Sequence, residues 1–199
     1  MKVVDRATHL LVAPQAEWDV ISHERTDVQS LYLNYIAILA ALPAAATFIS
    51  TALVGTLAAG RLDPMDAVGA TLTGYVLSLI MVYVVALAAD ALAPRFGGRK
   101  NMDEALKLTA YALTASWVAG LFTFLPVLAW LITLLGGLYS LYLFQVGAPA
   151  LMKVPDHKAA GYTVAVVAIA IVLSFLVGAL IATWFGMSAI GMLGAIGRF

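Results

Sequence analysis

A small number of polar side chains could carry chemistry in this chain, and Asp90 is the first of them. It lies between Ala-Leu-Ala-Ala and Ala-Leu-Ala, as an acid among small apolar residues. In a membrane protein such an acid is typical of a binding site or an ion pathway, and Lys107 or Arg95 is its expected partner. The alternative is an interfacial acid that reaches the lipid head groups or forms a structural salt bridge.

Four further polar residues border the same apolar stretches of sequence. We expect binding residues at Asn34, Lys107, Tyr111 and Gln145, together with Asp90. If all five face one side of a membrane, they form a polar pocket that is open to that side and closed to the other. Such a pocket would suit the binding of a lipid or a partner protein. It would also suit a small transporter or channel, although transport favours polar groups near the midplane.

The sequence does not favour an enzyme. It contains no cysteine, and therefore no thiol nucleophile, disulfide or cysteine-ligated metal site. His9, His23 and His157 all lie outside the apolar stretches, so a serine nucleophile inside the membrane would lack a base. An intramembrane aspartyl protease needs two facing aspartates, and only Asp90 qualifies. We therefore expect a protein that is not an enzyme and has no cofactor and no metal site.

Stretches of sequence without charged residues predict the helices that position these side chains. Four runs contain no Asp, Glu, Lys, Arg or His: 28–60, 67–89, 108–152 and 159–197, with lengths of 33, 23, 45 and 39 residues. A soluble helix needs only an apolar stripe, whereas a charge at the centre of a bilayer costs a few kcal/mol. The runs therefore predict a polytopic membrane protein. Its net charge of +0 predicts no nucleic-acid partner.

The lengths of the runs predict an all-α bundle of five transmembrane helices, since one span needs about 20 apolar residues. The longest run suits two helices, with Pro126 at the turn between them. The predicted spans are 31–57, 67–93, 104–125, 127–151 and 161–184. They form a domain over 30–185, between an N-terminal segment, 1–29, and a glycine-rich tail, 186–199, that is too short to cross again.

The basic residues predict the orientation of the bundle. With five spans, nine of the eleven Lys and Arg residues fall on the side of the N-terminus, and only Arg61 and Arg198 fall on the other. Cytoplasmic loops carry the excess of Lys and Arg, so we expect the N-terminus in the cytoplasm and the C-terminus outside. A four-span topology would reduce the split to 7:4 and is therefore less favoured.

Two segments on the cytoplasmic side are expected to contact lipid or protein. Pro14 suits the first turn of a helix, and Trp18 and Ile21 then share one face. We expect a short amphipathic cytoplasmic helix, which lies either on the membrane surface or on the cytoplasmic end of the bundle.

A basic loop follows the second predicted span. Arg95, Arg99 and Lys100 share it with two glycines and could contact anionic head groups, with Trp18 at the same interface. The alternative is that the three cations serve only to orient the protein.

Several motifs resemble the bacterial branch of the Yip family, integral membrane proteins named for Ypt-interacting proteins. The resemblance lies in 105–120, ALKLTAYALTASWVAG, then in Leu125-Pro126 and in Tyr139-Ser-Leu-Tyr142. The opening segment 13–21, APQAEWDVI, is similar to the family's Pro-x-x-x-Trp-x-x-Ile pattern. The resemblance extends over nearly the whole chain and implies five spans and a cytosolic N-terminus.

The resemblance also implies a general function. It implies a non-enzymatic protein of the bacterial inner membrane that acts in membrane organisation, or binds lipids or another protein at the cytoplasmic face. The expected partners are membrane lipids, another membrane protein or a second copy of the chain. The alternative is a small transporter or channel that uses a cytoplasm-facing pocket around Asp90.

Overall fold

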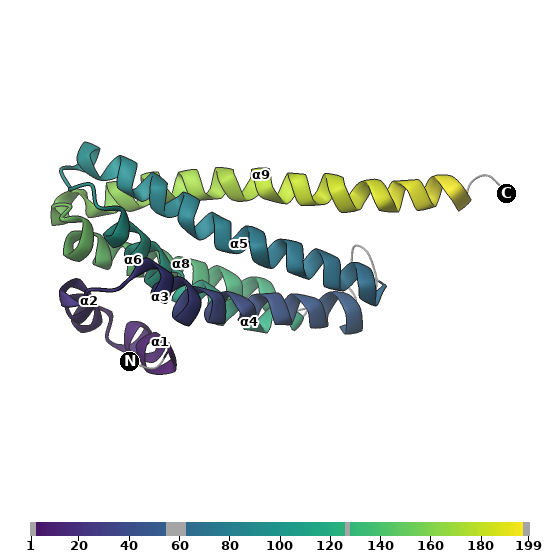
Figure 1. Ribbon diagram of the computed structural model, residues 1–199, viewed down its shortest axis with the longest axis horizontal. Coiled ribbons are helices and arrows are strands. Elements are labelled where there is room, and N and C mark those ends of the chain that lie inside the picture. The colour runs from purple at the N-terminus through teal and green to yellow at the C-terminus, as the bar shows by residue number, and fades with distance from the viewer. Residues whose placement is uncertain (1–2, 55–62, 126–127, 197–199) are drawn as a thin grey trace.

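The structure is a computed structural model that describes residues 3–54, 63–125 and 128–196, with side chains as far as 52 in the first range and 179 in the last. Every regular element in these ranges is helical. Five helical segments are long and apolar enough to cross a membrane: Val28–Ala52, Pro64–Phe96, Met102–Phe124, Ala129–Met152 and Asp156–Ala179. The prediction of an all-α membrane bundle with five spans is confirmed (Figure 1).

The helices follow one another through short connections. In chain order they are α1 Val3–Val12, α2 Pro14–His23, α3 Val28–Leu31, the π-helical turn η1 Tyr32–Ile36, α4 Ala37–Phe48, the π-helical turn η2 Ile49–Val54, α5 Pro64–Leu92, the 3-10 turn η3 Ala93–Phe96, α6 Met102–Ala112, α7 Thr114–Gly120, the 3-10 turn η4 Leu121–Phe124, α8 Ala129–Met152 and α9 Asp156–Ile196.

Side-chain caps begin the first three spans. Asp27, Asp63 and Asn101 each precede a helix and accept a hydrogen bond from a backbone N–H in its first turn, at 3.2, 3.0 and 3.3 Å. These caps satisfy donors that have no partner within the helix. The start of each span is therefore set by a polar residue at the edge of an apolar run.

The helix of the fifth span extends beyond its predicted end at residue 184. A glycine-rich tail separate from the fifth span was the expectation for 186–199, but α9 continues without a break to Ile196. A glycine inside a helix costs only about 1 kcal/mol relative to alanine, so scattered glycines do not have to end a long helix. At 41 residues α9 is about 60 Å long, roughly twice the hydrocarbon thickness. The turn predicted at Pro126 lies outside the described residues.

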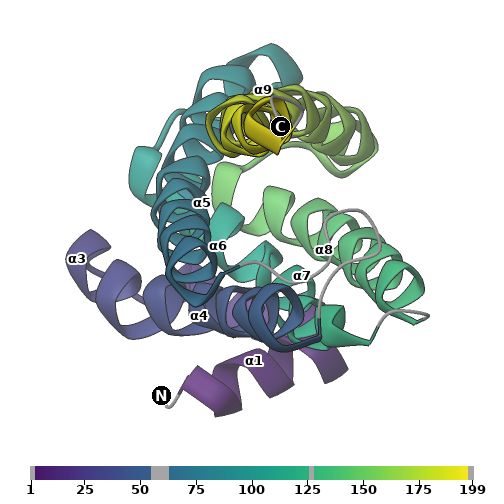
Figure 2. The ribbon, with the colours of Figure 1, turned by 90° about the vertical axis from the view of Figure 1, so that its right-hand side faces the viewer.

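The third span is the centre of the bundle. Its most apolar stretch is 72% buried within the protein, against 17–33% for the other four. Figure 2 looks along the helices and shows α4, α5, α8 and α9 arranged around α6 and α7. The third span also has the lowest mean hydropathy of the five. A helix that is surrounded by protein can carry polar residues that lipid would not accept.

The third span is also discontinuous. α6 ends at Ala112 and α7 begins at Thr114, with Leu113 between them in a turn. The Ser116 N–H, in the first turn of α7, donates to Ser140 Oγ of α8 at 3.0 Å. Irregular backbone at membrane depth is tolerated where other groups supply the missing hydrogen bonds. The neighbouring helix does so here.

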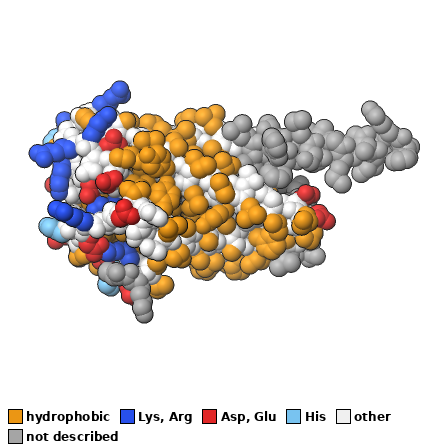
Figure 3. All heavy atoms as spheres, in the orientation of Figure 1, with side chains coloured by type: hydrophobic (Ala, Val, Ile, Leu, Met, Phe, Trp, Pro, Cys, Tyr) orange, Lys and Arg blue, Asp and Glu red, His pale blue; other side chains and the backbone are white. Residues whose placement is uncertain are grey.

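The N-terminal helices α1 and α2 pack on one end of the bundle. Trp18 and Ile21 of α2 are 1% and 0% exposed and belong to the hydrophobic core. Tyr139 of α8 donates to the carbonyl of Leu11 at 2.8 Å. The described Lys and Arg residues gather at this end of the molecule, next to a broad apolar band (Figure 3). The apolar face of α2 therefore meets protein.

Candidate functional site

A buried ion cluster joins the first two helices at the charged end of the molecule. The Arg6 guanidinium contacts Glu17 Oε1 and Glu24 Oε2, each at 2.5 Å, and Arg6 is 5% exposed. Burial disfavours the charged guanidinium, but the hydrogen bond with Glu24 and the other negative groups nearby outweigh this effect, and the pKa of Arg6 is raised above its usual value. Arg6 therefore stays charged at physiological pH.

Two predicted site residues meet this cluster from the third span. The Arg6 guanidinium carbon lies 5.7 Å from the centre of the Tyr111 ring. Lys107 is 2% exposed, and its Nζ donates to the Glu24 carbonyl at 2.9 Å and pairs with Glu104 Oε1 at 3.0 Å. Lys107 thus places its charge at the C-terminal end of α2, where backbone carbonyls favour a cation. Both residues hold the N-terminal helices on the bundle.

Asp90 does not form the expected ion pair. Lys107 is engaged with Glu104, and within the described ranges neither Lys107 nor Arg95 lies within 4.0 Å of the Asp90 carboxylate. Among the same residues no donor reaches Asp90 Oδ1, which is buried. At the preceding residue the Tyr162 hydroxyl of α9 donates to the Ala89 carbonyl of α5 at 2.8 Å. Asp90 therefore stands apart from the cluster around Arg6.

The remaining predicted residues lie elsewhere. Asn34 is exposed on η1 and donates to Ser30 Oγ at 3.1 Å. Gln145 is exposed on α8 and lines a cavity of about 420 Å³ that also involves Asp19 and Asp156. The five predicted binding residues do not meet in a single pocket. Only Lys107 and Tyr111 contact the same group of side chains.

Trp18 does not face the head groups. Its ring is 1% exposed and packs edge-on against Tyr111, with 6.3 Å between ring centres. On the other side α8 approaches closely, because a Cβ added at Gly147 would lie 2.7 Å from the indole ring. Protein therefore covers the ring of Trp18, the residue for which contact with lipid head groups was predicted.

The backbone of the basic loop packs against the end of α8, whereas its basic side chains are exposed. Gly97 adopts φ +84°, and a Cβ at Gly98 would lie 2.7 Å from the Met152 carbonyl, so the loop lies directly on the end of α8. The Arg99 N–H donates to the same carbonyl at 2.8 Å. Arg95, Arg99 and Lys100 are exposed, and Lys153 and Lys158 in the adjoining connection are exposed too. Two connections thus form one basic surface.

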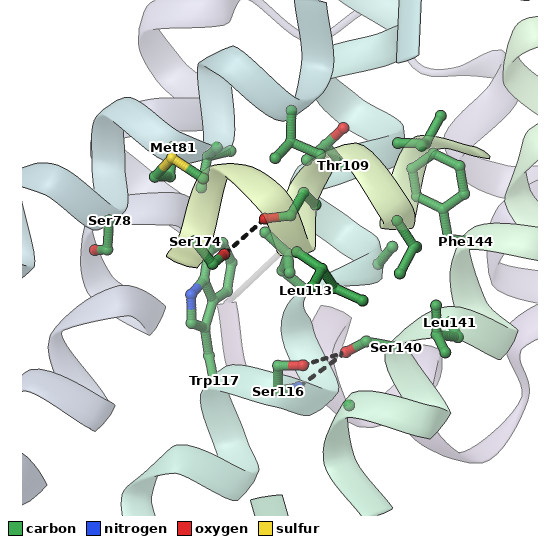
Figure 4. Close-up of a pocket in the computed structure, with 18 of the residues that line it drawn as sticks. Ser78, Met81, Thr109, Leu113, Ser116, Trp117, Ser140, Leu141, Phe144 and Ser174 are labelled. Carbon is green, nitrogen blue, oxygen red and sulfur yellow. Dashed lines mark hydrogen bonds between the residues drawn. The ribbon is translucent and has the colours of Figure 1, made fainter. Parts of the chain in front are cut away.

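A cavity of about 720 Å³ lies among the spans. Its lining comes from α5, α6, α7, α8 and α9, and all of these residues belong to the membrane-crossing segments (Figure 4). Leucine, valine, glycine and small hydroxyl residues dominate, and none of the lining residues is charged. Cavities of roughly 300–1,000 Å³ are the size that holds small ligands. This cavity can hold an apolar molecule from the membrane.

Sequence reasoning missed both the cavity and the role of Arg6. Cavity-facing serines such as Ser140 look the same in sequence as serines that pack between helices. Arg6 and Glu17 are 11 residues apart, a spacing that becomes a contact only because α1 and α2 fold back on each other. The described residues contain no group of three or more His, Asp or Glu side chains that could hold a metal ion.

Comparisons with known proteins give the family. The model of the Yip1 domain matches residues 8–178. The inner membrane protein YohC of Escherichia coli K12 is 24% identical over 184 residues, which is 86% of this chain and 91% of YohC. YohC of E. coli O6:H1 gives the same values. No solved structure matches the chain.

Proposed function

The chain belongs to the Yip1 domain family, and from this premise we propose that it is a non-enzymatic, lipid-binding protein of the bacterial inner membrane. The cavity among the spans is the observation that carries this proposal. In a bilayer its surroundings are lipid chains, and its apolar, uncharged lining suits such a chain. The lipid chain would occupy the cavity between α5, α8 and α9, against the central third span.

The basic surface supports a second part of the proposal. Arg95, Arg99, Lys100, Lys153 and Lys158 are exposed at one end of the bundle, where they would contact anionic head groups. Each Lys or Arg near a negatively charged membrane surface contributes about 1 kcal/mol of attraction. The protein would therefore hold lipids at two levels, with head groups at the basic surface and an apolar chain in the cavity.

The same surface supports the proposed orientation. The described basic residues lie at the end that carries α1 and α2. With the positive end in the cytoplasm, the N-terminus is cytoplasmic and the C-terminus periplasmic. The lipids at the basic surface then belong to the cytoplasmic leaflet.

The proposal can be tested with brominated lipids, because bromine quenches tryptophan fluorescence on contact. Trp117 lines the cavity, Trp18 is covered by protein, and Trp130 is 66% exposed. In a variant with Trp130→Phe and Trp184→Phe, emission comes from Trp117 and Trp18 alone. We expect phospholipids with brominated chains to quench Trp117 in reconstituted vesicles, and Trp18 to give a constant background.

Two glycines provide a matched pair of variants. A Cβ added at Gly137 or at Gly69 meets no atom within 4 Å, so both positions accept a large side chain. Gly137 lines the cavity and Gly69 does not. Gly137→Phe should reduce the quenching of Trp117, whereas Gly69→Phe should leave it unchanged. The variant with Trp130→Phe and Trp184→Phe is the parent protein for both glycine substitutions. Absence of Trp117 quenching in this parent, or equal quenching in Gly137→Phe and Gly69→Phe, would overturn the proposal.

A further inference from the structure

The polar atoms of the large cavity restrict which lipid fits it best, given the proposed function. Four hydroxyl groups in the lining already donate their proton to a carbonyl of their own helix. They belong to Ser78, Thr109, Thr133 and Ser174, at 2.7, 2.9, 2.7 and 2.7 Å from the carbonyls of Tyr75, Ala105, Ala129 and Ala170. These four groups have no proton left to offer a ligand.

The remaining hydroxyl pair differs from the other four. Ser116 Oγ and Ser140 Oγ lie 2.8 Å apart, and Ser140 Oγ also accepts the Ser116 N–H at 3.0 Å (Figure 4). The pair contains two hydroxyl protons, and one of them forms the hydrogen bond between the two oxygens. The second has no acceptor among the described residues. The pair can therefore donate one hydrogen bond to a molecule in the cavity.

Trp117 adds a second donor from the same helix. Its indole N–H can only donate, and in the described part of the chain no acceptor lies within hydrogen-bond distance of Nε1. Trp117 and the serine pair thus leave two unused protons on the wall of a cavity with no charged lining residue. A phosphate or an ammonium group would find no counter-ion there.

We propose that the cavity selects an uncharged lipid that carries a carbonyl oxygen. The oxygen accepts a hydrogen bond from the unused hydroxyl proton of the Ser116–Ser140 pair, and the apolar remainder fills the space between the helices. The pair lies 14 residues beyond the start of α6 and 12 before the end of α8, so it is about 20 Å from the basic end of the bundle. This depth is near the middle of the bilayer.

The depth separates the proposed ligand from ordinary phospholipids. In a phospholipid the ester groups lie near the head groups, at the edge of the hydrocarbon. A phospholipid chain in the cavity would place only methylene groups beside Ser116 and Ser140. A neutral lipid can enter the midplane with its carbonyl, because no charge has to leave water.

The test compares two competitors of the brominated chains described above. One is a long-chain ketone with its carbonyl at the middle carbon, and the other is the alkane of the same length. In the parent protein the ketone should restore Trp117 emission at about one-fifth of the alkane concentration, because one net hydrogen bond is worth about fivefold in affinity. Equal potency of the two competitors would overturn the proposal.

Three variants assign the effect to the serine pair. Replacing both Ser116 and Ser140 by alanine removes the unused hydroxyl proton, and the preference for the ketone should fall to what Trp117 alone provides. Ser116→Ala leaves that proton on Ser140 and should keep the preference. Ser78→Ala is the control, because its hydroxyl is already engaged with Tyr75. A double variant that prefers the ketone as strongly as the parent, or a Ser78→Ala variant that loses the preference, would contradict the inference.

The outcomes distinguish the two proposals. If brominated chains quench Trp117 but the ketone and the alkane compete equally, lipid binding stands and carbonyl selection fails. If brominated chains do not quench Trp117, lipid binding in the cavity fails, and carbonyl selection fails with it. Should the double variant not fold, the comparison in the parent protein and in Ser116→Ala still decides the question.

Discussion

Replacing Arg6 by alanine should release the N-terminal helices from the bundle. The Arg6 side chain lies between Glu17 and Glu24 and faces the Tyr111 ring. Without it, the Glu17 carboxylate is left in the protein interior with its main partner removed. The open state, in which α1 and α2 leave the bundle and Glu17 reaches water, gains in population as a result.

The size of the effect follows from the burial of the partners. Removing one member of a buried ion pair costs about 3–5 kcal/mol. The Glu17 side chain is only 7% exposed, but His9 Nδ1 lies 3.4 Å from its second oxygen and is itself accessible to water. Glu24 is 39% exposed and can be hydrated again. We therefore expect the lower end of the range, about 3 kcal/mol, which is roughly a 100-fold larger open population.

Hydrogen exchange of the backbone amides in α1 and α2, followed by mass spectrometry in detergent, measures this opening directly. Exchange over 3–23 should be roughly 100-fold faster in Arg6→Ala, while exchange in α5 and α8 stays the same. Arg25→Ala is the control, because Arg25 is exposed and its loss should change the free energy of opening by less than about 0.5 kcal/mol.

A double-mutant cycle attributes the effect to the ion pair. Glu17→Ala and Arg6→Ala should each accelerate exchange, and the double variant should be less perturbed than the sum of the two, with a coupling above about 1 kcal/mol. Unchanged exchange in Arg6→Ala, or additive effects in the cycle, would refute the reasoning from burial.

Three further changes test other parts of the structure. Gly136→Leu should lower the free energy of unfolding in detergent by about 1–3 kcal/mol, because its Cβ would overlap Ala119. Gly137→Leu should leave this free energy unchanged, because a Cβ at Gly137 meets no atom within 4 Å. Equal effects of the two variants would contradict the close approach of α7 and α8. Asp90→Asn should leave the melting temperature unchanged or raise it, since Oδ1 has no donor among the described residues, and a fall of several degrees would reveal a structural role. A reporter fused at the C-terminus should be periplasmic and one at Lys100 cytoplasmic, and a cytoplasmic C-terminus is incompatible with five spans in this orientation.

The membrane architecture could be predicted because it depends on one strong effect. A charge inside the hydrocarbon is costly, so the charge-free runs mark the spans whatever the helices pack against. The 45-residue run therefore predicts two helices, and the structure forms them as Met102–Phe124 and Ala129–Met152. The same reasoning predicts where Asp90 and Lys107 lie along their helices.

The contacts of those residues could not be predicted, because they depend on how helices turn toward one another. Lys107 could reach Asp90 of the second span or Glu104 one turn away on its own helix, and the local partner is the one it contacts. Trp18 has the amphipathic setting of an interfacial residue, but its ring fits the space that Gly147 leaves open. Hydrophobic periodicity shows that such a residue is covered and does not show whether lipid or protein covers it.

The docking of α1 and α2 has a consequence for how the protein is made. The Tyr139 hydroxyl binds the carbonyl of Leu11 across 128 residues of sequence, and Gln15 binds Tyr142 across 127. At a ribosomal rate of about 5–20 residues per second, the first two helices wait roughly 6 to 26 seconds for the surface that receives them. During that time Arg6 and Glu17 can remain hydrated. Although α1 and α2 are synthesised well before α8, they are thus among the last elements to be assembled.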